Sequence, residues 1–150
     1  MTTRSARAAL VLSLTALALT AGCAKKGDPV REPIDRITAA ADKRDADGVV
    51  AWIASDYHDE TGNGRAEIEG LVKRAFAGYD SLAVTVTKLQ IEPGFDVAHA
   101  SFDAELSGTP RAIGGLDGLL PRSSVWHFDL KLVKEKDKWK VGSAGWSQVR

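Results

Sequence analysis

The chain has few of the residues on which specialised sites and scaffolds depend. It contains one cysteine, Cys23, so no disulfide can form within a single chain and no zinc site of several thiolates can exist. No glycine-rich phosphate loop and no nucleophile elbow occurs in the sequence. Basic and acidic side chains balance to a formal net charge of +0, which leaves no electrostatic footprint for nucleic acid. We therefore expect no cofactor and no nucleic-acid partner.

The sequence also has no apolar run long enough to cross a membrane. The longest run, from Ala8 to Ala21, has about 14 residues, whereas a membrane-spanning helix needs ~20. It follows Arg4 and Arg7 and ends in small residues, an order typical of a secretory signal peptide. We predict that residues 1–22 are removed and contribute nothing to the fold.

The segment LTAGC, residues 19–23, resembles the lipobox of bacterial lipoproteins, although Thr20 stands where that motif most often has leucine. The resemblance implies that Cys23 is acylated through its sulfur and becomes the mature N-terminus. Since several acyl chains hold a protein stably on a bilayer, Cys23 is expected to be a permanent anchor. By the enterobacterial sorting rule, Ala24 implies an outer-membrane protein of the cell envelope that faces the periplasm. Residues 23–30 form the lipidated cysteine and a polar tether.

Residues 31–150 have a length that suits one domain, and their first half has helical periodicity. Pro33 suits a first helical turn, and the apolar spacing after it predicts a helix that ends near Lys43. Asp45 is a candidate N-cap for a second helix that extends to about Ser55. A third helix is predicted over 65–79, with an apolar stripe of Ile68, Leu71, Val72, Ala75, Phe76 and Tyr79.

The second half changes to the alternation of apolar and polar residues that is typical of β-strands. This pattern covers residues 81–92, 94–108, 124–135 and 136–150. A change of phase in the first strand predicts a bulge near Thr87 and Lys88, and a second change predicts a bulge at Gly142 and Ser143. Helices followed by an antiparallel sheet predict an α+β fold.

The order of these parts resembles the nuclear transport factor 2-like superfamily. The resemblance rests on SDYHDETGNG at 55–64, on the turn from Phe76 to Tyr79, and on WKVGSAGW at 139–146. It implies that N-terminal helices pack on a strongly curved antiparallel sheet over residues 31–150 and that the sheet encloses a conical pocket. Ketosteroid isomerases, dehydratases and polyketide cyclases use such a pocket, as do non-catalytic proteins that bind ligands or partners.

Two groups of apolar residues are candidates for binding a ligand or partner. The first group would line the pocket from the inner faces of the strands. The second lies in a long connection, residues 108–122, which is either a flap over the pocket mouth or a fixed loop that closes the core. The candidate residues are Phe102, Trp126 and Phe128 in the first group, and Ile113, Leu116 and Leu119 in the second.

The segment SDYHDETGNGR, residues 55–65, is dense in residue types that can bind metals. Counted from Asp59 it echoes a calcium loop, but Gly70 stands where that loop needs a bidentate glutamate. His58 has no second histidine at zinc-ligand spacing. We therefore predict no metal site, and interpret the segment as a connector in which Tyr57 packs inward and Gly62 to Gly64 turn the chain.

The remaining histidines, His99 and His127, are predicted on the polar faces of their strands. If those strands are neighbours, the two histidines belong to a charged sheet surface together with Asp103, Glu105, Asp129 and Lys131. Such a surface is either solvated or the contact face for a partner or a homodimer.

Three functions remain open on the sequence. The favoured one is a non-catalytic envelope lipoprotein that binds a small apolar ligand or another envelope protein through its pocket or sheet face. The second is an isomerase or dehydratase in which Asp56 acts with Tyr57 or Tyr79 as an acid/base pair. The third is a structural or assembly role at the membrane.

Overall fold

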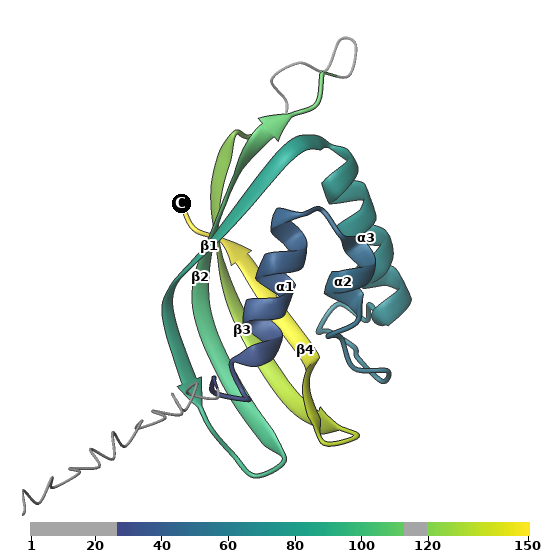
Figure 1. Ribbon diagram of the computed structural model, residues 1–150, viewed down its shortest axis with the longest axis vertical. Coiled ribbons are helices and arrows are strands. Elements are labelled where there is room, and N and C mark those ends of the chain that lie inside the picture. The colour runs from purple at the N-terminus through teal and green to yellow at the C-terminus, as the bar shows by residue number, and fades with distance from the viewer. Residues whose placement is uncertain (1–26, 113–119) are drawn as a thin grey trace, which may run out of the picture.

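The computed structural model describes residues 27–112 and 120–150 (Figure 1). Three helices precede a four-stranded antiparallel sheet in which the strands follow one another in the order β1-β2-β3-β4. The helices lie on one face of the curved sheet, so the predicted α+β fold is confirmed (Figure 1). The elements are α1 (Glu32–Asp42), α2 (Ala46–Val50), α3 (Arg65–Ala77), β1 (Tyr79–Glu92), β2 (Val97–Pro110), β3 (Ser123–Glu135) and β4 (Lys138–Gln148).

The helix boundaries follow local capping chemistry. Pro33 lies in the first turn of α1, where its missing N–H costs no hydrogen bond. Asp45 caps α2 because its Oδ1 accepts a hydrogen bond of 2.9 Å from the backbone N–H of Gly48. The N-terminus of α3 is closed by Glu67, whose carboxylate accepts a hydrogen bond from the Gly64 N–H at 2.9 Å.

The second helix is shorter than the sequence predicts, and the prediction that it extends to about Ser55 is wrong. It ends at Val50, after which the chain pairs with the edge strand β4 in a short parallel bridge between Ile53 and Val141. Ala54 N–H donates to the Val141 carbonyl, and Val141 N–H donates to the Trp52 carbonyl, both at 2.9 Å. These backbone groups are therefore used by the sheet and cannot continue the helix.

Both predicted bulges are present. The register between β1 and β2 shifts between Thr87 and Gln90, where Lys88 has a φ of 54°. The register between β3 and β4 shifts at Gly142, which has no partner opposite it. A left-handed residue other than glycine is unusual, so the Lys88 bulge fixes a strained backbone that turns its side chain out of the regular alternation.

The core lies between α1 and the inner face of the sheet, which is the face toward the helices. Ile34 of α1 is buried there with Leu132 of β3 and other inner-face residues. Helix α3 stands at the rim (Figure 1), and no residue of it is fully buried. Leu71 of its predicted apolar stripe is 39% exposed. The longest helix therefore leaves part of its apolar stripe accessible at the open end of the fold.

Candidate functional site

The inner-face aromatics predicted to bind a ligand are packed against each other. Phe102 is buried, and its ring stacks on that of Phe128 with 5.4 Å between the centroids. Trp126 is half-buried, and its indole N–H donates to Ser124 Oγ at 3.1 Å. The three side chains lie on the inner face as predicted. Whether they bind a ligand stays a prediction.

The residues of the hypothetical acid/base pair do not meet within the described part of the chain. Tyr57 is buried in the core, and burial, followed by the nearby Asp59 charge, raises the pKa of its phenol to about 12. Asp56 is exposed beside it in sequence. The hydroxyl of Tyr79 donates to the Pro121 carbonyl at 2.9 Å. Within residues 27–112 and 120–150, no hydrogen bond joins any two of these three side chains.

Several candidate residues lie outside the described residues. They are Cys23, the predicted lipidation site, and Ile113, Leu116 and Leu119 of the connection between β2 and β3. In the described part, no helix is both long enough and apolar enough to span a bilayer.

The segment from Ser55 to Arg65 uses its polar groups to build a turn. Asp59 Oδ1 accepts from the N–H and Oγ1 of Thr61 and from the N–H of Asn63, and Asp59 Oδ2 accepts from Asn63 Nδ2, all within 2.9 Å. Desolvation raises the pKa of Asp59, but these hydrogen bonds together outweigh it and lower the pKa to about 2. Gly62 completes the turn with a φ of 84°. Among the described residues, no group of three or more His, Cys, Asp or Glu side chains is arranged to hold a metal.

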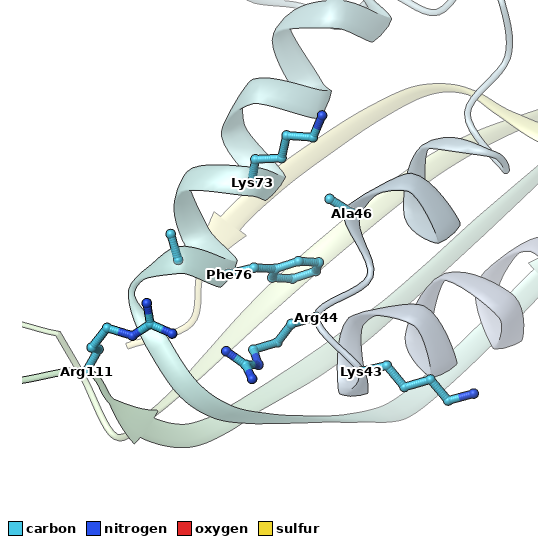
Figure 2. Close-up of a pocket in the computed structure, with 7 residues that line it drawn as sticks. Lys43, Arg44, Ala46, Lys73, Phe76 and Arg111 are labelled. Carbon is cyan, nitrogen blue, oxygen red and sulfur yellow. The ribbon is translucent and has the colours of Figure 1, made fainter.

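A hollow of about 380 Å³ opens where the α1–α2 link meets the C-terminal end of α3. We call it the basic hollow because four of its lining residues are cationic. Figure 2 shows the Phe76 ring pointing from α3 toward the α1–α2 link, close to Arg44 and Ala46. The lining residues are Lys43, Arg44, Ala46, Lys73, Phe76, Ala77 and Arg111.

Arg44 is the cation that the fold holds most firmly in this hollow. Its Nη1 donates to the Tyr79 carbonyl at 2.7 Å, so the side chain bridges the α1–α2 link to the start of β1. Its backbone has a φ of 54°, a left-handed conformation that costs energy for a residue with a side chain. In the described part of the chain, no ion pair involves Arg44, so its charge is not offset by a carboxylate.

The other cations of the basic hollow are partly neutralised. Arg111 Nε lies 3.0 Å from Asp80 Oδ1. Lys73 pairs with Glu69 and lies 3.9 Å from Asp47. The Lys43 side chain extends away from the Phe76 ring (Figure 2). The excess positive charge beside the ring therefore comes chiefly from Arg44.

A second hollow, of about 640 Å³, includes much of the outer face of the sheet, the face away from the helices. We call it the outer hollow. His127 lies in it, and its Nδ1 is 2.7 Å from Asp103 Oδ1 while its Nε2 is 3.3 Å from Ser101 Oγ. Lys88 Nζ lies 2.7 Å from the second oxygen of Asp103. The expected charged surface is present, but Asp103 is only 6% exposed and is not the solvated residue that its polar strand face suggested.

Three residues that make the hollows distinctive, Arg44, Phe76 and Ser101, were not predicted from the sequence as site residues. Arg44 and Phe76 lie on different elements, and nothing in their sequence spacing connects them. Ser101 could have been found by aligning HASFD with HFDLK as antiparallel neighbours, because Asp103 then falls opposite His127 and Ser101 lies two residues from Asp103 on the same strand face.

No protein-family model matches the sequence, and no curated protein matches it as a relative. Among solved structures, the chain is similar to a Novosphingobium aromaticivorans protein provisionally named a scytalone dehydratase. The TM-score is 0.68 at 10% identity, over 81% of this chain and 83% of that one. A nuclear transport factor 2-like superfamily protein of Salmonella enterica gives a TM-score of 0.66 at 14% identity, over 81% and 89% of the two chains.

A third similar structure is a protein of Bdellovibrio bacteriovorus, with a TM-score of 0.63 at 11% identity. The match covers 77% of this chain but only 39% of the Bdellovibrio chain. At these identities the similarity concerns the fold alone. The described residues therefore adopt the nuclear transport factor 2-like fold, in which helices pack on a curved four-stranded antiparallel sheet.

Proposed function

We propose that this protein is a lipid-anchored lipoprotein of the bacterial envelope that binds a small organic anion, without catalysis, in the basic hollow. The observation that carries the proposal is the presence of the Phe76 ring and the Arg44 guanidinium in one hollow. The proposed ligand differs from the small apolar ligand expected from the sequence. It carries a negative charge as well as an apolar group, because the hollow is lined by cationic side chains as well as an aromatic ring.

The chemistry of the lining selects a ligand with two parts. A carboxylate or similar anion can accept charge-assisted hydrogen bonds from Arg44, whose remaining N–H groups are not used by a carboxylate of the described chain. A flat apolar group can pack on the Phe76 ring in the same hollow. A volume of about 380 Å³ falls in the range of small-molecule sites.

The proposed anchor, Cys23, precedes the N-terminal end of α1 in the chain, whereas the basic hollow is at the C-terminal end of this helix. Cys23 is the proposed lipidation site, in an outer membrane with the domain in the periplasm, and it is joined to α1 by a short tether. The basic hollow lies at the other end of α1, where Lys43 and Arg44 line it. This arrangement supports a binding site directed away from the anchoring membrane and open to the aqueous compartment.

A binding role is favoured over an isomerase or dehydratase role because the candidate acid and base are separated. Tyr57 is buried with a raised pKa, whereas Asp56 faces solvent. A proton-transfer pair must reach one substrate together. The two side chains offer no such shared position.

The proposal is tested by NMR titration of the purified protein with naphthoate and with naphthyl methanol, its neutral counterpart. We expect naphthoate to shift the amide resonances around Arg44 and Phe76 and to bind about tenfold more tightly than the alcohol. The Arg44→Gln variant should lower the affinity for naphthoate by about the same factor and leave the affinity for the alcohol unchanged. The control is Arg36→Gln, which removes an exposed cation from α1 outside the hollow. Equal affinity for both compounds, or an Arg36 effect as large as that of Arg44, contradicts the proposal.

A further inference from the structure

Two residues that line the outer hollow, Ser101 and His127, are joined to the buried Asp103 in the order of side chains that activates a serine. Asp103 Oδ1 is 2.7 Å from His127 Nδ1, and His127 Nε2 is 3.3 Å from Ser101 Oγ. An ionised carboxylate can only accept, so Nδ1 of the neutral imidazole carries the proton. The lone pair of the ring is then at Nε2, which faces the Ser101 hydroxyl at 3.3 Å and also lies 3.5 Å from Asp129 Oδ2.

The Asp103 carboxylate is held by a polar contact at each of its two oxygens. Lys88 Nζ is 2.7 Å from Asp103 Oδ2, which leaves Oδ1 for His127. The hydrogen bond from Lys88, followed by that from His127, holds the pKa of Asp103 below its usual range. Lys88 reaches this position from the β1 bulge with its left-handed φ of 54°. Strained residues and bulges that redirect a side chain are concentrated at functional sites. Here the strained backbone of Lys88 directs its ammonium group toward Asp103.

The surroundings of Ser101 provide space and a second polar contact. The outer hollow has about 640 Å³ beside the serine, and the exposed Trp146 also lines it. Gln90 is the cross-strand partner of Ser101 and lines the same hollow. Because cross-strand partners have Cβ atoms within about 5.5 Å, the Gln90 amide can donate to an oxygen held at the serine.

We propose that Ser101 and His127, positioned by Asp103, form a nucleophilic site that hydrolyses small esters on the outer face of the sheet, separate from the basic hollow. Ser101 Oγ attacks the ester carbonyl carbon while its proton passes to His127 Nε2, and the carbonyl π electrons move onto oxygen. When the carbonyl re-forms, the bond to the alkoxy group breaks and the departing alcohol takes the proton from Nε2. A water molecule then attacks the acyl-serine by the same route and releases the carboxylic acid and free Ser101.

The test uses a fluorophosphonate ester, which phosphonylates an activated serine with loss of fluoride, and locates the adduct by mass spectrometry. We expect one adduct, on Ser101, in the wild-type protein and none at this position in Ser101→Ala. His127→Gln should slow labelling by a factor of about 10² or more, since general-base catalysis contributes about that much. His127 has a side chain that is 40% exposed, so this variant is expected to fold.

The control is Ser81→Ala, which removes an exposed serine hydroxyl of β1 that bonds to Thr109 and not to a histidine. This variant should label at the wild-type rate. Absence of a Ser101 adduct in the wild-type protein overturns the proposal. Labelling of His127→Gln at the wild-type rate also overturns it, because the hydroxyl is then not activated by the imidazole.

The positioning role of Asp103 has its own readout in a double-mutant comparison. Asp103→Asn removes the carboxylate that accepts from His127 Nδ1, so labelling of Ser101 should slow when His127 is present and should not slow further in the His127→Gln background. A variant that lost only packing would slow labelling in both backgrounds. Near-ultraviolet circular dichroism confirms that the variant retains its tertiary structure.

Discussion

Ser55 and Glu135 are separated by 80 residues in the chain and are joined by two hydrogen bonds. The backbone N–H and the Oγ of Ser55 both donate to Glu135 Oε2, at 2.8 and 2.7 Å. Lys140 Nζ lies 3.0 Å from the other oxygen of the same carboxylate. These contacts fasten the segment that follows α2 to the β3–β4 hairpin, so the ionisation of one carboxylate is coupled to the docking of the helices.

The first prediction is that Glu135 makes the fold sensitive to acid. The two hydrogen bonds from Ser55, followed by that from Lys140, lower the pKa of Glu135 to about 2 from its usual 4.5. Since the folded pKa lies below the unfolded one, the stabilisation is present above pH 4.5 and is lost as the pH falls toward 2. Glu135→Gln should therefore lower the free energy of unfolding near pH 7 by about 1–2 kcal/mol and flatten its pH dependence in this window. Urea denaturation at several pH values measures both effects.

The control for Glu135 is Glu92→Gln, because Glu92 is an exposed residue of β1. This substitution should leave the fall of the unfolding free energy at acid pH unchanged. If Glu135→Gln destabilised the protein equally at pH 2 and pH 7, the ionised carboxylate would not be the stabilising species.

The second prediction concerns the buried phenol of Tyr57. Its folded pKa of about 12 exceeds the usual 10.0, so the stabilisation is complete below pH 10 and is lost as the pH rises toward 12. Titration of phenolate absorbance should show a transition with an apparent pKa near 12 that is absent from Tyr57→Phe. The parallel variant Tyr79→Phe retains this transition if the assignment to Tyr57 is right.

The third prediction concerns the turn built on Asp59. Changing Asp59 and Asn63 together to Ala removes the hydrogen bonds that hold the turn, so the melting temperature should fall by about 3–5 °C. The fall should be the same in calcium and in chelator, because the carboxylate oxygens are occupied by the turn. Calorimetry under both conditions measures it. A calcium-dependent melting temperature in the wild-type protein contradicts the connector interpretation.

The fourth prediction concerns the membrane anchor. Cys23→Ser should leave the fold unchanged and move the processed protein from the membrane fraction to the soluble periplasmic fraction, because the acylated sulfur is lost. Fractionation followed by immunoblotting measures the distribution. A cleaved Cys23→Ser protein that stayed with the membrane would show that something other than the lipid retains it.

Local sequence patterns determined much of the fold. Asp45 could be identified as a cap because the N–H groups of a helix start need a nearby acceptor, and the acceptor lies three residues from the donor. The bulge at Lys88 could be predicted because the apolar residues of β1 change phase there, and only an extra residue keeps both halves facing the core. Such features depend on neighbours in the chain, so a sequence can specify them directly.

The short length of α2 and the two hollows were decided by tertiary structure alone. The α2 helix stops where β4, about 90 residues further along the chain, supplies backbone partners that compete with the helix. Arg44 and Phe76 meet because the α1–α2 link and the end of α3 converge at one end of the sheet. Asp103 is buried on a polar face because strand register brings His127 opposite it and the β1 bulge turns Lys88 toward it. Each of these contacts depends on the relative placement of distant segments, and that placement is set by packing of the whole core and not by the spacing of residues along the chain.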